Sequence, residues 1–177
     1  RSSAAARTLI ENGADVNARN YRGMSPLHRA RNIGVARVLL ENGAVVNAID
    51  SLGNSALHLS NDVEVVRLLL KYSASITQRN LKGEPPIHMS TYGSKVLVLA
   101  KAGADIDAVD MRGRTLLMKK ARCIYAFRLL RDLLSLNPSI FFKDRYGKTA
   151  TDFTIDDTVK RCLLDYAVEQ NWRRRKM

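Results

Sequence analysis

Residues 50–79 read DSLGNSALHLSNDVEVVRLLLKYSASITQR, and this stretch decides the fold because it recurs with altered residues on both sides. A glycine turn at Gly53 leads into a short helix that Ser55 is expected to cap, and residues 63–70 supply the apolar face of a second helix. A helix pair of this size cannot bury its apolar faces alone, so it needs copies of itself stacked on either side. The sequence therefore predicts an array of helix pairs.

Glycine turns recur along the chain at a nearly constant interval. They fall at Gly23, Gly53, Gly83, Gly113 and Gly147, which gives spacings of 30, 30, 30 and 34 residues. A second set of turn residues, expected to end the second helices, is Gly13, Gly43, Ser73 and Gly103. Each of these is followed by alanine and a short polar–apolar run, which predicts a hairpin-like connection.

Length and composition place the chain among soluble proteins. Its 177 residues are 46% hydrophobic, which is enough for a continuous core. No apolar run approaches the roughly 18 to 20 residues that a membrane-spanning helix needs. The two cysteines, Cys123 and Cys162, lack a CxxC partner and are expected to be small core residues in a reducing compartment. These features predict an intracellular protein, cytoplasmic, nuclear or both.

The chain is strongly basic, with 29 Lys and Arg against 17 Asp and Glu and a net charge of +12. Residues 1–109 carry 13 basic and 9 acidic side chains, whereas residues 110–177 carry 16 and 8. Such a field favours an acidic protein partner, a nucleic acid or an anionic surface. A simpler interpretation stays open, in which the charges form a solvated face that keeps the protein in solution.

A second motif follows each turn glycine. It reads SPLH at 25–28, SALH at 55–58, PPIH at 85–88, TLLM at 115–118 and TATD at 149–152. Ser or Thr can cap the first helix, Pro suits its first turn, and the hydroxyl and His can form hydrogen bonds between neighbouring repeats. Together with NGADVNA and VVRLLL, these motifs resemble ankyrin repeats over nearly the whole chain. The resemblance implies an all-α ankyrin-repeat solenoid that acts as a noncatalytic protein-interaction module, a scaffold or adaptor.

The repeat motifs define the expected organisation of the chain. A partial first repeat at 1–19 supplies a second helix without a first one, and a start without Met favours an excised fragment over a worn cap. The other expected units are repeats at 20–49, 50–79 and 80–109, a longer divergent repeat at 110–143, a capping repeat at 144–171 and a basic tail at 172–177. The tail could be a nuclear import signal, a second contact for an acidic partner or a frayed end.

Two departures from the ankyrin pattern carry structural expectations. The family period is about 33 residues, whereas the complete repeats before residue 110 are 30 long, with residues missing between the motif His and the second helix. Their first helices are therefore expected to lose about one turn. In the longer repeat, residues 115–136 have lost the motif Pro and His and are expected to form one long helix that Asn137 and Pro138 stop.

Two motifs that suggest chemistry have structural interpretations that we prefer. His28, His58 and His88 occupy equivalent repeat positions, which lie about 8 to 10 Å apart in stacked helices, too far to share a zinc ion bound at about 2 Å. Residues 147–149 end like a phosphate-binding loop, but Phe142 stands where that loop needs glycine. With no Ser/His/Asp or Cys/His constellation outside the repeat positions, the sequence predicts no enzyme activity, no metal and no cofactor.

By resemblance to ankyrin arrays, the hairpin tips and the exposed side of the first helices are expected to form a groove that binds the partner. The predicted partner-binding residues are Arg19, Tyr21, Arg22, Arg29, Leu52, Arg79, Leu81, Lys82, Met89, Tyr92, Met111, Arg112, Arg114, Lys119, Lys120, Arg145 and Tyr146. The groove is basic at both ends and more apolar around Leu52 and Leu59. We therefore expect the partner to be an acidic, partly apolar segment or domain of another protein.

Lys119 and Lys120 occupy first-helix positions at which the family favours small or apolar residues, and they are expected to converge with Arg112 and Arg114. Like charges held close together repel each other unless a partner of opposite charge neutralises them. Reversal of Arg112, Arg114 and Lys119 to Glu is expected to abolish binding at a nearly unchanged melting temperature. Two alternatives stay open: a nucleic-acid or polyanion binder, supported by pairs of basic and aromatic residues, and a rigid spacer.

Overall fold

The chain folds into helices and turns, which a computed structural model describes for residues 2–122 and 127–175. It divides into two compact units, residues 1–104 and residues 105–177, called the N-terminal and C-terminal units below. Within the described ranges, no helix is both long and apolar enough to cross a membrane.

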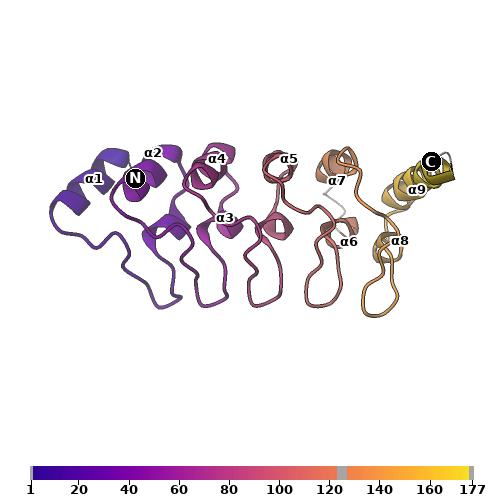
Figure 1. Cartoon of the computed structure of the whole chain (residues 1–177), viewed down its shortest axis with the longest axis horizontal. Coiled ribbons are helices and arrows are strands. Elements are labelled where there is room, and N and C mark those ends of the chain that lie inside the picture. Colours follow the sequence, from indigo (N-terminus) through magenta and orange to yellow (C-terminus); the bar gives the residue numbers. More distant parts are fainter. Residues whose placement is uncertain (1, 123–126, 176–177) are drawn as a thin grey trace. The chain divides into compact units, whose positions relative to one another are not determined.

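In the N-terminal unit, the second helices of successive repeats lie side by side in one row, and the hairpin tips project away from them (Figure 1). These helices are α1 (Ser3–Glu11), α2 (Ile33–Glu41), α4 (Val63–Lys71) and α5 (Gly93–Lys101). The core that α2, α4 and α5 share is built from buried residues thirty positions apart, which are Leu39, Leu69 and Leu99 together with Ala36, Val66 and Val96. The 30-residue period of the sequence is therefore the period of the core.

The first helices of this unit are a single turn each. They are η1 (Pro26–Arg29), α3 (Ala56–Leu59) and η2 (Pro86–Met89). Each is followed by an extended residue, Ala30, Ser60 or Ser90, and only three residues separate it from the next second helix. The prediction that the 30-residue repeats have shortened first helices is confirmed.

The predicted turn residues at the ends of the second helices adopt the left-handed backbone conformation that stops a helix. Gly13, Gly43 and Gly103 have φ angles of 85°, 83° and 91°. Ser73 takes the same conformation with φ of 61°, although its side chain disfavours it. The equivalence of Ser73 to the three glycines, inferred from the repeat, is confirmed.

Each hairpin tip is held by the side chain of its first residue. Asp50 Oδ1 accepts hydrogen bonds from the amides of Leu52 at 2.9 Å and Asn54 at 2.8 Å. The residues that do the same in the other tips are Asn20, Asn80, Asp110 and Asp144. Neighbouring tips are also joined through the main chain, as where Leu81 N donates to Leu52 O at 2.9 Å. The tips are therefore ordered structures with a fixed backbone.

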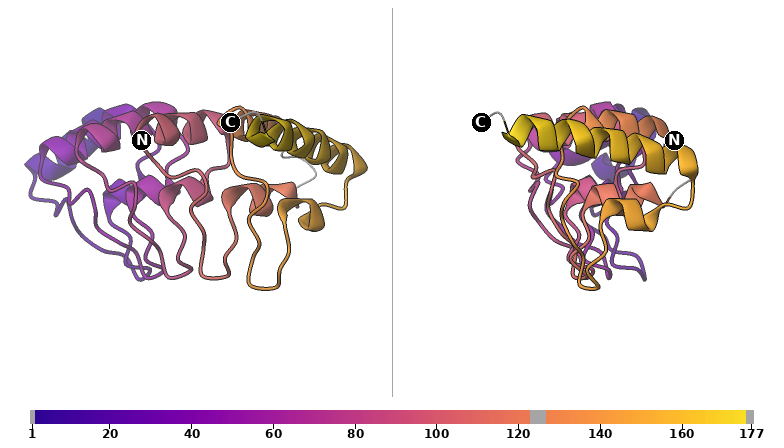
Figure 2. Two further views of the ribbon diagram at one scale, coloured as in Figure 1. Left: turned by 45° about the vertical axis from the view of Figure 1, so that its right-hand side comes forward. Right: turned by 90° about the vertical axis from the view of Figure 1, so that its right-hand side faces the viewer.

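The C-terminal unit contains two further repeats. Their helices are α6 (Leu116–Ala121), α7 (Phe127–Leu134), α8 (Ala150–Phe153) and α9 (Asp157–Arg175). Within this unit α6 packs on α7 and on α8, and α8 packs on α9, with a tip below each first helix (Figure 2). Each repeat thus keeps the order of tip, first helix and second helix.

The prediction of one long helix over residues 115–136 is wrong. Helix α6 ends at Ala121 with Arg122 as its C-cap, and α7 begins at Phe127; residues 123–126, and with them Cys123, lie outside the described ranges. Leu117 of α6 and Leu130 of α7 are both buried, and the two helices pack on each other. Two segments of one straight helix cannot pack on each other, so the apolar faces of both segments are buried only as two helices.

Helix α9 continues to Arg175, so the expected basic tail begins inside this helix. Val159 and Leu163 are buried, as the predicted inner face requires. Leu164 and Val168 are 48% and 69% exposed on the same helix. The last second helix therefore carries an outer surface that is partly apolar.

Candidate protein-interaction surface

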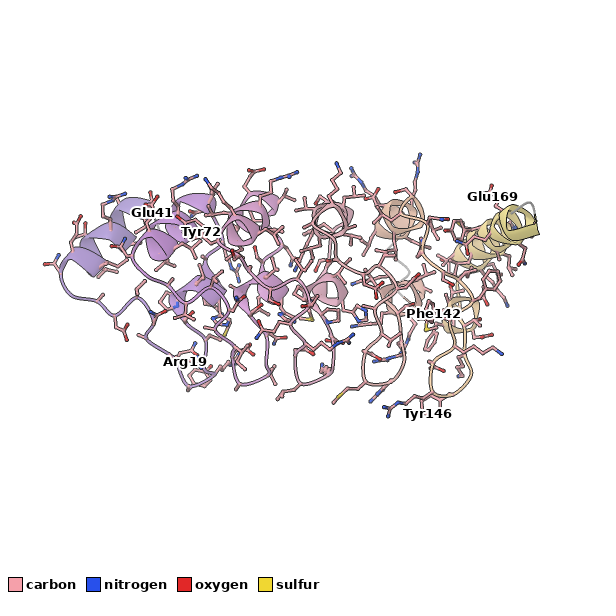
Figure 3. All side chains as sticks on the ribbon, viewed as in Figure 1. Arg19, Glu41, Tyr72, Phe142, Tyr146 and Glu169 are labelled. Atoms are coloured by element: carbon pink, nitrogen blue, oxygen red, sulfur yellow. The ribbon has the colours of Figure 1, made fainter. Side chains whose placement is uncertain are left out.

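Every hairpin tip exposes one large apolar side chain close to its turn glycine. These side chains are Tyr21 (89% exposed), Leu52 (60%) and Leu81 (67%) in the N-terminal unit and Met111 (58%) and Tyr146 (77%) in the C-terminal unit. Figure 3 shows Tyr146 at the end of its tip. A single exposed apolar residue is ordinary on a protein surface, but here one recurs in every tip, one or two residues before the turn glycine, and so provides a repeated apolar contact point.

A basic residue stands next to the apolar one in all tips but the second. These basic residues are Arg22, Lys82, Arg112 and Arg145. The Arg22 guanidinium lies over the ring of Tyr21, 5.3 Å from its centroid, which is cation–π distance. The second tip has Ser51 beside Leu52 and is the least charged, as the sequence predicts.

Arg19 and Arg79 flank the tips and are partly engaged with the backbone. Arg19 Nη1 donates to Ile49 O at 3.1 Å and so links two repeats. Arg79 Nη1 donates to a carbonyl of its own tip. Figure 3 places Arg19 among the hairpins, on the side opposite Glu41 of α2. Both arginines are exposed, although each already donates a hydrogen bond to a backbone carbonyl. Contact of these two residues with a partner stays a prediction.

Three predicted residues lie on or after the first helices. Arg29 is exposed, Tyr92 is 61% exposed and Met89 is half-buried. Tyr92 is the N-cap of α5 but makes no side-chain capping hydrogen bond. The structure brings Arg29 and Tyr92 together in the wall of a groove of about 470 Å³, with Leu59 also in the wall.

Arg114 is engaged inside its own repeat. Its Nε and Nη2 both donate to Asp110 Oδ2, at 3.0 Å and 2.7 Å, and the Asp110 side chain is only 2% exposed. Burial by itself would raise the pKa of Asp110, but hydrogen bonds from Arg114 and from the Arg112 amide hold it below its usual range. Arg114→Glu would place two carboxylates together in a mostly buried site. This change would lower the melting temperature, contrary to the expectation for the triple reversal.

Lys119 and Lys120 lie at the end of α6, half-buried, and each interacts with other groups of the protein. Arg112 and Arg145, by contrast, are exposed on neighbouring tips of the C-terminal unit, where Arg145 N donates to Arg112 O at 3.0 Å. The tip arginines are therefore the better-placed basic residues of this unit, and contact through the two lysines stays a prediction.

The motif histidines link neighbouring repeats of the N-terminal unit. His28 Nδ1 accepts from the Ser25 amide at 3.1 Å, and His28 Nε2 lies 3.0 Å from Asn54 O in the next repeat. His58 repeats this pattern with Ser55 and with Glu84 O at 3.1 Å. Because Nδ1 accepts a hydrogen bond from an amide, Nε2 must carry the ring proton and donate the hydrogen bond to the carbonyl. These two histidines are therefore neutral structural links.

The residues that resemble a phosphate-binding loop form the last tip instead. Asp144 Oδ1 accepts from the amides of Tyr146 and Lys148, and Gly147 has φ of 73°. Asp152 accepts from both the amide and the hydroxyl of Thr149, and these hydrogen bonds lower its pKa. In the part of the chain that the structure describes, no three His, Cys, Asp or Glu side chains group to hold a metal ion.

Sequence reasoning missed several residues that the structure brings into view. Arg31 and Ser60 line the same groove as Arg29, and the only signal for them was their position directly after a shortened helix. Lys95 is fully buried, and its Nζ donates to His58 O at 2.8 Å at the end of α3. Val65 stands at the position thirty residues earlier, so Lys95 is a lysine at a core position.

Comparison with known families agrees with this architecture. A family model described as ankyrin repeats, in three copies, matches residues 1–80. The same order of tip, first helix and second helix continues beyond the match to α9. The chain therefore has the fold of an all-α ankyrin-repeat solenoid, and ankyrin repeats are generally protein–protein interaction modules. A search of curated proteins finds no match to the chain.

Proposed function

We propose that this protein is a noncatalytic scaffold or adaptor whose hairpin tips bind an acidic, partly apolar segment of another protein. One observation carries the proposal: an exposed large apolar side chain recurs on every tip, beside a basic residue on all tips but one. Aromatic residues and arginine are frequent anchors of protein interfaces. Exposed charges of one sign on the tips favour a partner of the opposite sign.

The tips can serve this function without a cofactor. Their backbone is fixed by side-chain and main-chain hydrogen bonds, so binding requires little ordering of the protein. Tyr21 with Arg22 and Leu81 with Lys82 present the same chemistry at the first and third tips of the N-terminal unit. We expect the partner to be met inside the cell, in the cytoplasm, the nucleus or both.

The test compares two variants of equal charge. The tip variant carries Arg22→Glu, Lys82→Glu, Arg112→Glu and Arg145→Glu. The helix variant carries Arg7→Glu, Arg37→Glu, Lys101→Glu and Arg131→Glu, all exposed residues of second helices. Each variant has four reversals, which lower the net charge from +12 to +4. Arg114 is left unchanged because it pairs with Asp110.

The readout is quantitative pull-down from a cell extract with the wild-type chain and both variants as bait. We expect to recover proteins that the wild type and the helix variant retain in equal amounts, within about twofold. The tip variant should retain less than about one tenth of the wild-type amount of these proteins. Melting temperatures measured by circular dichroism check that both variants are folded. Equal retention by the tip variant and the wild type would contradict the proposal.

A nucleic-acid or polyanion binder is the second candidate, favoured by the net charge of +12 and by the stacked pair of Arg22 and Tyr21. It predicts binding to random-sequence oligonucleotides with a steep loss of affinity as salt rises. The protein-binding proposal predicts saturable retention of particular proteins that survives moderate salt. Titration of labelled oligonucleotides at several salt concentrations separates the two.

A further inference from the structure

A groove in the N-terminal unit follows from the shortened first helices. It has a volume of about 470 Å³, and its wall takes residues 28–31 from one repeat, residues 59–62 from the next and Tyr92 from the third. These residues come at or directly after the ends of η1, α3 and η2. Because each of these helices stops after one turn, the residues that follow line a hollow instead of a further helical turn.

The charges that face the groove are predominantly positive. Arg29 and Arg31 are both exposed in its wall, and neither forms a salt bridge with another side chain of the described ranges. Asp62 is the facing carboxylate, and its Oδ1 already accepts from two amides at the start of α4. His28 is neutral, as its hydrogen bonds require. The groove therefore has two guanidinium groups whose positive charge is not neutralised by a salt bridge within the described ranges.

The wall also offers a polar atom and an apolar surface. Ser60 Oγ is buried and makes no hydrogen bond within the part of the chain that the structure describes. A buried hydroxyl without a partner is costly, and a polar atom of a bound segment would satisfy it. Leu59 and the Tyr92 ring supply apolar surface beside it.

We infer that this groove binds an acidic side chain of a partner peptide together with the apolar residue next to it. The planar guanidinium groups of Arg29 and Arg31 match a carboxylate, which each can bind through paired hydrogen bonds. The neighbouring apolar side chain packs against Leu59 and Tyr92. The volume of the groove lies in the range of about 300 to 1,000 Å³ that is usual for small-ligand sites. The groove can therefore accept the side chains of a short peptide segment. The inference rests on the proposed function and gives it a specific recognition site.

The probe is a phage library of random twelve-residue peptides, panned against the 177-residue chain. The groove variant Arg29→Gln/Arg31→Gln removes both charges and keeps much of each side-chain stem. The matched control is Arg7→Gln/Arg37→Gln, which removes two charges from exposed positions on α1 and α2. A further variant, Tyr92→Ser, removes the ring and places a residue that favours helix N-caps at the start of α5.

We expect the wild type and the control to select peptides with Asp or Glu next to an apolar residue. Fluorescence anisotropy with the selected peptides should give an affinity at least tenfold weaker for the groove variant and within twofold of wild type for the control. Tyr92→Ser should also weaken binding, without a fall in melting temperature. Selected peptides without an acidic residue, or equal affinity for the groove variant, would overturn the inference.

The tip variant separates this inference from the proposed function. If acidic peptides are selected and bind the groove variant normally but fail on the tip variant, the groove assignment falls and the function stands. If the wild-type chain selects no acidic peptides, both the groove inference and the proposed function are contradicted.

Discussion

At the scale of single residues, the buried histidines are kept neutral. Burial lowers the pKa of His28 and His58, and their hydrogen bonds to Asn54 O and Glu84 O only partly oppose this effect. A second proton on Nδ1 would remove the acceptor that the preceding serine amide uses. Protonation of either ring therefore opposes the folded state.

The free energy of unfolding should fall as the pH is lowered from 7.5 to 5.5. The folded-state pKa lies below the ordinary value of 6.5, so the unfolded chain binds more protons in this range. Stability is fully present above pH of about 6.5 and declines as the pH falls toward the folded-state pKa. Urea unfolding at several pH values measures the slope, which should be flatter in His28→Gln/His58→Gln. A variant with the wild-type slope would assign the pH dependence to other groups.

Ser73 offers a direct test of the helix-ending turns. Its φ of 61° is costly for a residue with a side chain and free for glycine. Ser73→Gly should therefore raise the free energy of unfolding by up to about 1 kcal/mol. The matched change Gly43→Ser should lower it, because Gly43 has φ of 83° and open space around its Cβ position. Thermal melts of both variants give the signs, and two shifts of the same sign would refute this account of the turns.

Some residue-scale features could be predicted from the sequence and others could not. The role of His28 and His58 follows from a motif that recurs in register. Lys95 and Arg114 have no such motif, and a charged residue is expected at the surface because burying a charge is costly. Lys95 depends on a partner in another repeat, His58 O, and Arg114 on the turn of its own tip, which places Asp110 beside it.

At the scale of elements, side chains in the loops after the second helices join consecutive repeats. Asn47 Oδ1 accepts from the Ser75 amide at 2.8 Å, and its Nδ2 donates to Ser73 O at 3.3 Å. In the C-terminal unit the Asp107 carboxylate accepts from the Ser139 amide, and burial raises the pKa of Asp107. These hydrogen bonds join the loops of consecutive repeats, in addition to the packing of the apolar core.

Removal of the Asn47 bridge should weaken the stack within the N-terminal unit. Asn47→Ala removes two hydrogen bonds at an exposed site, so we expect a loss of about 1 kcal/mol in the free energy of unfolding. Asn47→Asp keeps the acceptor and loses only the donor, so its cost should be about half. Denaturant titration compares the two. An equal cost for both variants would show that the Ser75 contact contributes little.

The order of elements was predictable because the repeat fixes it. The missing residues between the motif His and the second helix correctly predicted one-turn first helices. The interruption between α6 and α7 was not predicted, because residues 115–136 have helical periodicity without Gly or Pro. There the need to bury two apolar faces against each other overrides local helix preference.

At the scale of the whole molecule, the positive charge is shared between the units. The N-terminal unit has 13 basic and 7 acidic residues, and the C-terminal unit has 16 and 10, which gives +6 for each. Both units can therefore contribute to binding an acidic partner. The sequence predicted the tips as the contact region from family resemblance, but it could not predict the groove at Arg31 and Ser60, which depends on how three repeats meet.

The central claim is that the tips, and not the second helices, bind the partner. Amide hydrogen exchange of the wild-type chain, with and without a protein recovered by the pull-down, tests this claim most directly. We predict slower exchange on binding in the tips, with the second helices of the N-terminal unit unchanged; the tips are residues 20–24, 50–54, 80–84, 110–114 and 144–148. Protection confined to α1, α2, α4 and α5, with no change in any tip, would contradict the account.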